Sequence, residues 1–472
     1  MTSNAIMWFR QDLRTSDNAA LLAATKNHRV LPIYIWDTSC PKHYQPGAAS
    51  RWWLHHSLCS LSSSIEDRLH VFSGEPQEIL NELIKQHDID AVYWNRCYEP
   101  WQIKRDQRIK KELLKNGVNA QSFNSHLLWE PWEISKADGT PYKVFTPFFK
   151  RGCLTATPPR KPQKKPSTPT YFNLSKTNTI DTLNLLTTKN WHTKFEAHWK
   201  PGEKFAQQTL TRFIKNSVSE YKLARDIPAM QATSRLSPHL HFGEISPHQV
   251  WHKAKNAVAH DLENENLYSF LSELGWREFS YSLLYHFPQL PKKNWKPKFD
   301  SFQWENNPSL LRRWQQGQTG IPFVDAGMRE LWQTGFMHNR VRMVASSFLV
   351  KNCLIDWRKG ERWFWDCLVD ADLASNAQGW QWVAGSGADA APFFRIFNPV
   401  TQGKRFDQNG QYIRHYVPEL AALPTKYLFC PWEAPTEVLQ KAGVILSKNY
   451  PLPIIDLKQS RTRALEVHKN CR

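Results

Sequence analysis

The segment from Asp370 to Trp382 is the densest group of polar and aromatic side chains in the sequence. It contains two carboxylates, Asp370 and Asp372, the amide of Asn376, and two tryptophans, Trp380 and Trp382. Buried acids and amides need hydrogen-bond partners, and the hydroxyls and ring nitrogens of a bound cofactor can supply them. We therefore expect part of a cofactor site in this segment.

A second group combines an acid, an aromatic ring and a guanidinium. Glu273, Trp276 and Arg277 are three and four residues apart, so in a helix they share one face. Such a face suits a planar ligand that accepts and donates hydrogen bonds. On spacing alone, the alternative of a surface ion pair beside a core tryptophan is favoured.

Two more segments could bind a ligand at the start of a helix. Asn339, Arg340 and Met343 would face one side and offer an amide, a charge and a soft apolar contact; the plain alternative is a hydrogen-bonded helix end. The run Thr233–Ser237 holds hydroxyls and one arginine, which suits a phosphate or pyrophosphate. Taken alone, this run is more simply explained by ordinary capping by serine and threonine.

Several common chemistries have no motif in this chain. It contains no Walker loop, no GxGxxG fingerprint, no GxSxG elbow and no HExxH site. The eight cysteines form no CxxC pair and no Cys/His ligand spacing, which favours a reducing compartment and no structural metal. Metal, covalent serine and P-loop chemistries are therefore disfavoured, and we expect no metal.

The composition favours an anionic partner. The chain has 472 residues and a net charge of +18, which suits nucleic acid or an acidic membrane surface, although a generally basic soluble protein is also compatible. No stretch reaches the roughly 18 apolar residues of a membrane span, and the N-terminus does not resemble a signal peptide. We expect a cytoplasmic protein that does not contact a membrane. The 22 tryptophans could fill a core, stack on planar ligands or conduct electrons.

The elements that must position these residues begin with an α/β region over residues 1–125. Short apolar runs at Ala5–Phe9, Val30–Ile35, Leu69–Phe72 and Ala91–Trp94 predict buried strands. Between them, Ile79, Leu80, Leu83 and Ile84 mark one face of a helix. Alternation of strand and helix predicts a parallel, Rossmann-like sheet.

A long connection and a helical region follow. Residues 126–199 are expected to form an interdomain linker; its run Lys150–Lys165 has six basic residues and no acidic one, which indicates a solvated surface or a contact to DNA. Residues 200–472 are expected to form a large all-α domain, since apolar residues recur at helical spacing between Val341 and Leu349. Ser237-Pro238 and Ser246-Pro247 are each expected to cap a helix.

At this point the sequence resembles the DNA photolyase/cryptochrome family over nearly its whole length. Trp8–Arg14 with Asp17-Asn18 is similar to the N-terminal signature of the family, and Thr319–Ala326 through Met337–Arg340 to its central one. Asp356–Arg358, the Asp370–Trp382 segment and Phe394–Pro399 complete the pattern in the family's order.

The resemblance implies an N-terminal antenna domain and a C-terminal helical domain that binds FAD. By position in the motifs, the FAD contacts would be Tyr221, Thr233, Ser234, Arg235, Leu236, Ser237, Phe270, Arg277, Asp370, Ala371, Asp372 and Asn376. Asn376 corresponds to the residue beside flavin N5, where photolyases have Asn, plant cryptochromes Asp and animal cryptochromes Cys.

The resemblance also implies a substrate. The pocket for a cyclobutane pyrimidine dimer in class I bacterial enzymes would comprise Glu273, Trp276, Arg277, Asn339, Arg340, Met343 and Trp382. Asn339 and Met343 stand where (6-4) photolyases have a pair of histidines. Trp380, Trp357 and Trp304 are similar to the tryptophans that relay electrons to the flavin, and Glu273 and Asn376 would act in the reaction itself.

The chain departs from the family pattern in two places. Trp101-Gln102 replaces an Asn-Glu pair that binds folate in class I bacterial enzymes, so a folate-type second chromophore would need a variant site, with Glu99, His43 and Lys292 as candidates. Phe270 stands where a tryptophan is common.

The sequence thus predicts a light-driven repair enzyme, a monomer that acts on UV-damaged DNA without an obligate protein partner. Two alternatives remain: a cryptochrome-like blue-light sensor without repair, and a non-catalytic nucleic-acid-binding module. Asn376, the dimer pocket and the absence of a long C-terminal tail favour repair over the sensor.

Overall fold

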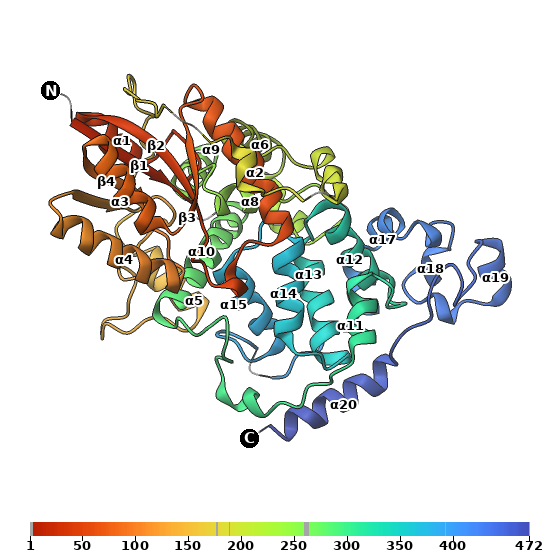
Figure 1. Ribbon diagram of the computed structural model, residues 1–472. Coiled ribbons are helices and arrows are strands. Elements are labelled where there is room, and N and C mark those ends of the chain that lie inside the picture. Colours follow the sequence, from red (N-terminus) through yellow and green to blue (C-terminus); the bar gives the residue numbers. More distant parts are fainter. Residues whose placement is uncertain (1–2, 176–177, 188, 259–263, 392, 472) are drawn as a thin grey trace. The chain divides into compact units, whose positions relative to one another are not determined.

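The computed structural model describes residues 3–175, 178–187, 189–258, 264–391 and 393–471 (Figure 1). The chain divides into two compact units. Unit 1 comprises Met1–Ser219, Ser234–Pro288 and Asp372–Ala374, and unit 2 comprises Glu220–Thr233, Gln289–Ala371 and Ser375–Arg472. Each unit therefore draws on segments that are far apart in the sequence. The predicted boundaries at residues 125 and 199 stay a prediction.

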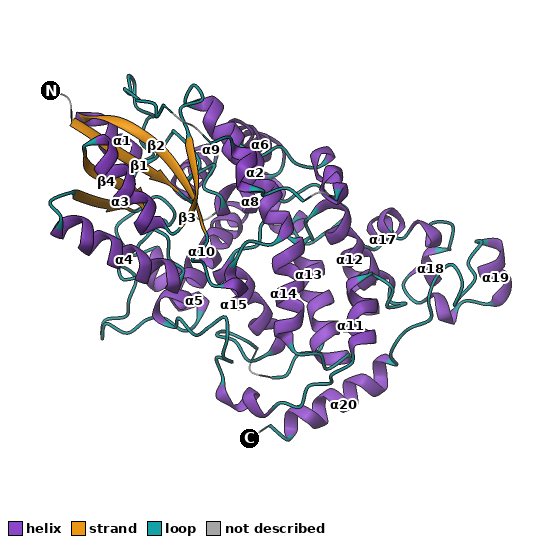
Figure 2. Ribbon diagram, in the orientation of Figure 1, coloured by secondary structure: helices purple, strands orange, loops and turns teal. Residues whose placement is uncertain are grey.

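A five-stranded parallel sheet with the order β3-β2-β1-β4-β5 lies in unit 1 (Figure 2). The strands are β1 (Ser3–Phe9), β2 (His28–Asp37), β3 (His70–Gly74), β4 (Ile89–Asn95) and β5 (Asn119–Phe123). Each predicted strand overlaps an observed one, which confirms the α/β prediction. Strand β5 was not predicted because its sequence, NAQSF, has no apolar run and only Ala120 is buried.

Helices and the two faces of the sheet form the core of unit 1. Helix α3 (Pro76–His87) buries Leu80 and Leu83, as the apolar spacing predicts. These residues pack with strand side chains such as Ile6, Val92 and Trp94. The strand order reverses direction beside β1, and in open parallel sheets ligands bind at that reversal, outside the carboxyl ends of the strands.

The N-terminal signature of the sequence fixes the turn that follows β1. The Asn95 amide donates to Asn18 Oδ1 over 2.7 Å and also to the Asp12 carboxylate. Asn18 in turn caps helix α1 (Ala19–Asn27) by accepting from the Leu21 amide at 3.0 Å. These polar side chains therefore tie the ends of two central strands to a helix start.

The segment 126–199 is anchored to the sheet. The Val30 amide donates to the Thr170 carbonyl at 2.8 Å, and the Phe172 amide donates to Val30 at 3.1 Å. Further along, the Gln163 amide donates to Asp17 Oδ1 at 2.8 Å. The segment forms α5 (Phe145–Pro147), η2 (Phe148–Cys153), η3 (Ile180–Leu183) and η4 (Asn190–Ala197). The described parts of this segment therefore contact the sheet of unit 1 and the turn that follows β1.

From residue 200 onward, the described residues form helices, turns and loops apart from one isolated bridge, Leu446 to Tyr450. This confirms the all-α prediction. The elements are α6 (Glu203–Asn216), η5 (Val218–Glu220), α7 (Tyr221–Ala224), α8 (Ser237–His241), α9 (Pro247–Ala257), α10 (Glu265–His286), η6 (Pro297–Ser301), α11 (Pro308–Gln315), α12 (Pro322–Thr334), α13 (Asn339–Ser347), η7 (Phe348–Asn352), α14 (Trp357–Cys367), α15 (Leu373–Ala384), α16 (Pro399–Phe406), α17 (Gln411–Tyr416), η8 (Pro418–Leu420), α18 (Thr425–Leu428), η9 (Pro431–Glu433), α19 (Thr436–Lys441) and α20 (Leu457–Lys469). Helices η1 (Lys42–Tyr44), α2 (Ala48–Ser64) and α4 (Pro100–Lys115) belong to the α/β region. Among the helices of the described ranges, none has the length and apolarity needed to span a bilayer.

One of the two predicted serine caps is confirmed and one is wrong. Ser246 caps α9 in a capping box with Gln249. Helix α8, however, already includes Ser237, and Leu236 holds the cap position without a side-chain hydrogen bond to the helix. The Ser-Pro pair therefore lies one residue inside the helix, because Leu236 itself has helical dihedral angles.

Much of the tryptophan content lies in the core of unit 2. Trp314 and Trp357 are fully buried there, together with the predicted helical residues Val341, Phe348 and Leu349. The helix prediction over 341–349 is confirmed, although α13 passes into the wider turns of η7 at Phe348.

Glu278 gives unit 1 a pH-dependent contact. Its buried carboxylate accepts hydrogen bonds from the Leu128 amide at 2.9 Å and the Trp129 amide at 3.3 Å, and burial raises the pKa of Glu278 to about 7. The folded chain thus keeps a proton that the unfolded chain loses above about pH 4.5, so stability falls as pH rises from about 4.5 to 7.

Between pH 5 and pH 8, we expect Glu278→Gln to lose about 1–3 kcal/mol less folding stability than the wild type. The melting temperature of the variant, relative to that of the wild type, should therefore rise by a few degrees over this range. Melting curves of both proteins across this range check the prediction. Parallel curves would contradict it.

Candidate functional site

A buried hydrogen-bond network in unit 1 joins the start of the linker to helix α10 and Asp372. Arg277 donates to the His126 carbonyl at 2.7 Å and contacts His126 Nε2 at 2.6 Å. Tyr281 lies 2.9 Å from the same ring nitrogen and donates to the Asp372 carboxylate. His241 Nδ1 lies 3.3 Å from Asp372 Oδ2. The network therefore connects two predicted cofactor residues, Arg277 and Asp372, through His126 and Tyr281.

The charges of this network are well defined. Burial alone would raise the pKa of Asp372, but His241, Arg277 and the Tyr281 hydroxyl hold that pKa well below its usual range. Burial and the nearby Arg277 lower the pKa of His126 well below its ordinary value. At neutral pH, Asp372 is thus a fixed anion and His126 is a neutral ring. A fixed buried carboxylate of this kind can accept hydrogen bonds from the hydroxyl and ring N–H groups of a ligand.

Trp276 is held face to face by an aromatic side chain from the linker. Its ring centroid lies 3.8 Å from that of Phe145, at an interplanar angle of 9°. Phe145 stacks in turn on Phe149 at 5.7 Å and 9°. A Cβ on Gly275 would lie 2.5 Å from the Phe149 ring, so glycine is needed for this close packing. One face of Trp276 is therefore covered by Phe145, while the side chain as a whole stays half-buried, as does Glu273 on the same helix.

The run Thr233–Ser237 contains a strained residue. Arg235 has a φ of 51°, a left-handed conformation that side chains other than glycine rarely adopt, and its guanidinium lies 4.1 Å from the centre of the Trp199 ring. Strained residues of this kind cluster at ligand sites. Phe270, also a residue of unit 1, is buried against Phe213, with ring centroids 4.7 Å apart. Thr233 belongs to unit 2 and the rest of the run to unit 1.

In unit 2, the predicted DNA-contact residues lie at the start of α13. His338 caps the helix by accepting from the Arg340 amide at 3.2 Å, and Asn339 is exposed. Arg340 contacts the Met343 sulfur at 3.9 Å and pairs with Asp226 at 2.6 Å. The contact confirms that Arg340 and Met343 share one side of the helix.

The acid and amide of the Asp370–Trp382 segment that lie in unit 2 have defined partners. Asp370 accepts from Arg342 over 2.9 and 3.1 Å. The Asn376 amide nitrogen donates to both the Glu361 carbonyl at 3.1 Å and its carboxylate at 3.2 Å. Burial raises the pKa of Glu361 to about 7. Since Glu361 orients the amide nitrogen, the Asn376 oxygen is directed to the opposite side. Ala371 and Tyr221 are buried.

The three predicted relay tryptophans all belong to the core of unit 2 or pack against it. Trp380 and Trp357 are 3% and 0% exposed, whereas Trp304 is partly exposed and packs against the same core. A Cβ on Gly360 would lie 2.2 Å from the Trp380 ring, so α14, which begins at Trp357, lies directly against Trp380. The Trp382 indole nitrogen donates to the Asp389 carbonyl at 3.0 Å.

The residues considered for a second chromophore are distributed over both units. Glu99 precedes α4 and is buried; Gln11 donates to one of its oxygens at 2.8 Å, and its other oxygen has no hydrogen-bond partner among the described residues. Trp101 packs under Arg105 at 5.2 Å. The ring of His43 lies 4.0 Å from that of Tyr44 in unit 1, and Lys292 belongs to unit 2. A variant folate site stays a prediction.

Sequence reasoning missed four residues that support the site: His126, Phe145, Tyr281 and Glu361. None lies in one of the four segments singled out in the sequence. Tyr281 is four residues after Arg277 and could have been found as part of the same helix face. The other three contact their partners from distant segments.

Comparison with known proteins decides the family. The profile described as DNA photolyase matches residues 5–167, and the profile described as the FAD binding domain of DNA photolyase matches residues 270–470. A deoxyribodipyrimidine photo-lyase of Agrobacterium fabrum is 49% identical over 99% of this chain and 98% of its own length. The chain belongs to the DNA photolyase/cryptochrome family.

Other members of the family are similar over the same length. Cryptochrome-1 of Arabidopsis thaliana is 38% identical over 98% of this chain and 70% of its own length. A solved bacterial class III photolyase from Agrobacterium tumefaciens is 48% identical, covers 99% of this chain and 98% of its own, and has a TM-score of 0.95. The sequence resemblance pointed to class I enzymes, whereas this neighbour is described as class III; the family is the same.

The polar groups of this chain fit FAD, the cofactor of the family's binding domain. The segment around the left-handed Arg235 has hydroxyls on both sides and can bind phosphates at the start of α8 by donating hydrogen bonds to them. The fixed Asp372 anion and the oriented Asn376 oxygen are suited to hydroxyl and ring N–H groups. The individual contacts remain those that the resemblance implies.

Proposed function

We propose that the protein is a photolyase that repairs cyclobutane pyrimidine dimers in UV-damaged DNA. The observation that carries the proposal is Trp276, whose ring is held rigidly by Phe145 and which stays half-buried. A preorganised aromatic platform can stack on an extruded pyrimidine, an interaction worth about 1–3 kcal/mol per base. Flipping out a damaged base costs less than flipping out an intact one, which adds selectivity.

The roles of the remaining residues follow from their chemistry. Reduced FAD, when bound, supplies the electron that splits the dimer under light. Glu273 would hydrogen-bond the pyrimidine carbonyls, and Arg340, with its guanidinium fixed by Asp226, would contact phosphate. Asn376 offers an amide beside the flavin, which donates no readily lost proton.

Relatives named as repair enzymes support this proposal. The 49% identical relative is named a deoxyribodipyrimidine photo-lyase, as is a 36% identical relative from Escherichia coli. The second candidate is a blue-light sensor, favoured by the 38% identity to a plant cryptochrome. Asn376 favours repair, since the family resemblance implies Asp at this position in plant cryptochromes.

A repair assay tests the proposal directly. Purified, reduced protein is mixed with an oligonucleotide that contains a thymine dimer and is illuminated, and recovery of absorbance at about 260 nm is followed against a dark control. Light-dependent recovery is expected. A protein that carries reducible FAD and gives no recovery would overturn repair in favour of the sensor.

The Asp372 anion gives a prediction on cofactor content. Asp372→Asn removes a buried charge that His241 and Tyr281 hold in place, so we expect purified variant protein to carry several-fold less FAD than the wild type. The ratio of absorbance at about 450 nm to that at 280 nm measures this content. Asp356→Asn, on a partly exposed carboxylate at a helix cap in unit 2, is the control and should retain FAD. Equal FAD content in Asp372→Asn would contradict the role of this carboxylate.

A further inference from the structure

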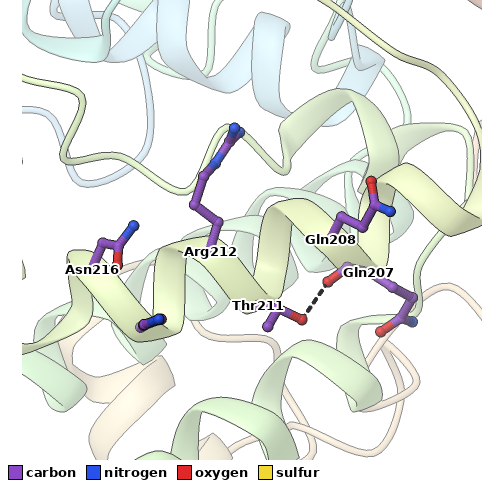
Figure 3. Close-up of a pocket in the computed structure, with 6 residues that line it drawn as sticks. Gln207, Gln208, Thr211, Arg212 and Asn216 are labelled. Carbon is purple, nitrogen blue, oxygen red and sulfur yellow. Dashed lines mark hydrogen bonds between the residues drawn. The ribbon is translucent and has the colours of Figure 1, made fainter.

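Helix α6 in unit 1 exposes a face that carries cations and amides without an acid. Lys204, Gln208, Thr211, Arg212, Lys215 and Asn216 are all exposed and recur at three- and four-residue spacing. Five of them, with Gln207, contribute to a shallow depression along the helix. Figure 3 shows Gln208, Arg212 and Asn216 projecting to the same side of α6. We call this surface the α6 face.

Glu203, the one acidic residue of helix α6, is hydrogen-bonded inside unit 1. Glu203 accepts hydrogen bonds from the Thr15 amide and hydroxyl at 2.8 and 3.0 Å and from the Ser16 amide at 2.9 Å. Its charge is thus turned away from the solvent face of the helix. The α6 face therefore keeps the full charge of three cations.

A fourth cation joins the face from α9. The Lys253 amine donates to the Thr211 hydroxyl at 2.7 Å, and that hydroxyl donates to the Gln207 carbonyl at 2.7 Å. The Thr211 side chain is thereby fixed between the two helices. The result is a cationic surface with an ordered centre rather than a set of independent lysines.

Helix stability does not explain this arrangement. Arg212 and Lys215 lie near the C-terminal end of α6, where cations favour the helix dipole, but Lys204 lies in the first turn, where a cation opposes it. A basic residue at a position that the dipole disfavours, in line with two others, suits an external polyanion. Lysine, arginine, threonine and the side-chain amides are also the groups that contact DNA phosphates.

We propose that the α6 face binds the phosphate backbone of duplex DNA outside the damaged base pairs. Lys204 and Lys215 are 11 residues apart, which corresponds to about 16 Å along the helix, long enough to contact more than one phosphate of a strand. The contact is independent of sequence and of damage, and it adds to binding by neutralising phosphates. It extends the proposed function to the undamaged flanks that such an enzyme must bind while searching.

The test measures the salt dependence of binding to an undamaged duplex of about 20 base pairs by fluorescence anisotropy. Each neutralised phosphate contributes about 0.9 to the slope of log K against log salt, so Lys204→Gln, Arg212→Gln and Lys215→Gln together should make the slope less steep by about 2 to 3. The control replaces three exposed lysines of α4, Lys104, Lys111 and Lys115, by Gln. The control removes the same charge and should leave the slope nearly unchanged.

Two results would overturn the proposal. One is a slope in the α6 variant that equals that of the wild type; the other is an equal change in the α4 control, which would indicate net charge alone. FAD content and melting temperature of both variants establish that the fold is intact. A changed slope in a protein that repairs no dimers would support the α6 face and refute the proposed repair function, so the two can fail separately.

Discussion

Trp380→Phe should reduce light-driven reduction of the bound flavin by at least an order of magnitude and leave repair by chemically reduced protein intact. Trp380 is buried in the core of unit 2 against α14, the helix that begins with the buried Trp357. Trp304 is the partly exposed member of the set and therefore the ring that solvent can reach. Phenylalanine fills most of the space but is far harder to oxidise, so electrons should no longer pass.

Absorbance changes at about 450 nm during illumination with a reductant in solution check this prediction. Trp314→Phe is a demanding control, because Trp314 is also fully buried and its ring centroid lies 6.1 Å from that of Trp380. It should keep most of the photoreduction. If Trp314→Phe alone abolishes photoreduction, the electrons follow a different route. Repair by dithionite-reduced variants shows whether the fold and the cofactor site survive.

The second large effect concerns the stack beneath the proposed lesion. Trp276→Ala should weaken binding of dimer-containing DNA by about 1–3 kcal/mol, or about 5- to 150-fold, because the platform for one base is lost. Phe145→Ala should weaken it less, by about 0.5–1.5 kcal/mol, since it removes only the ring that fixes Trp276 at 3.8 Å. Binding to undamaged duplex should hardly change in either variant.

Competition binding with damaged and undamaged oligonucleotides separates these effects. Trp132→Ala serves as the control, because Trp132 is another tryptophan of unit 1, 48% exposed and in contact with Tyr285 at 5.6 Å. Equal losses on damaged and undamaged DNA would show that Trp276 contributes to general DNA binding and does not recognise the lesion. If Phe145→Ala binds dimer-containing DNA as tightly as the wild type, Trp276 does not need Phe145 to hold its ring in place.

The fold was largely predictable because its signals are local. Apolar runs of four to six residues marked four of the strands, and the three- and four-residue spacing around Val341 marked α13. Strand β5 escaped because an edge strand with a polar sequence needs its neighbour, β4, to become a strand. Ser237 shows the same limit for caps: the dihedral angles of Leu236 decide where α8 begins, and the sequence does not specify them.

The residues of the candidate site were predictable from the sequence, whereas the side chains that hold them in place were less so. Arg277 and Asp372 were expected to act on a ligand, and the structure shows that His126 contacts Arg277 and that Tyr281 donates to Asp372. His126 is 151 residues from Arg277. Phe145, which positions Trp276, comes from a segment expected to be a linker. Contacts at such separations depend on how elements pack, and no periodicity in one sequence reports them.

The hydrogen bonds that the Asp17 carboxylate accepts have a consequence for how the protein folds during synthesis. Asp17 has a φ of 54°, and its carboxylate accepts from Arg160, the Gln163 amide and the Ser246 hydroxyl. Ser246 is 229 residues downstream. At a synthesis rate of about 5–20 residues per second, the ribosome needs about 10–50 s to deliver Ser246 after Asp17 has been made. The strands of the sheet are all synthesised by residue 123, yet this buried carboxylate waits for its last partner through most of that time. Arg160 and the Gln163 amide follow Asp17 by only 143 and 146 residues, so the ion pair can form while the chain is still being made, and the Ser246 hydrogen bond closes the site last.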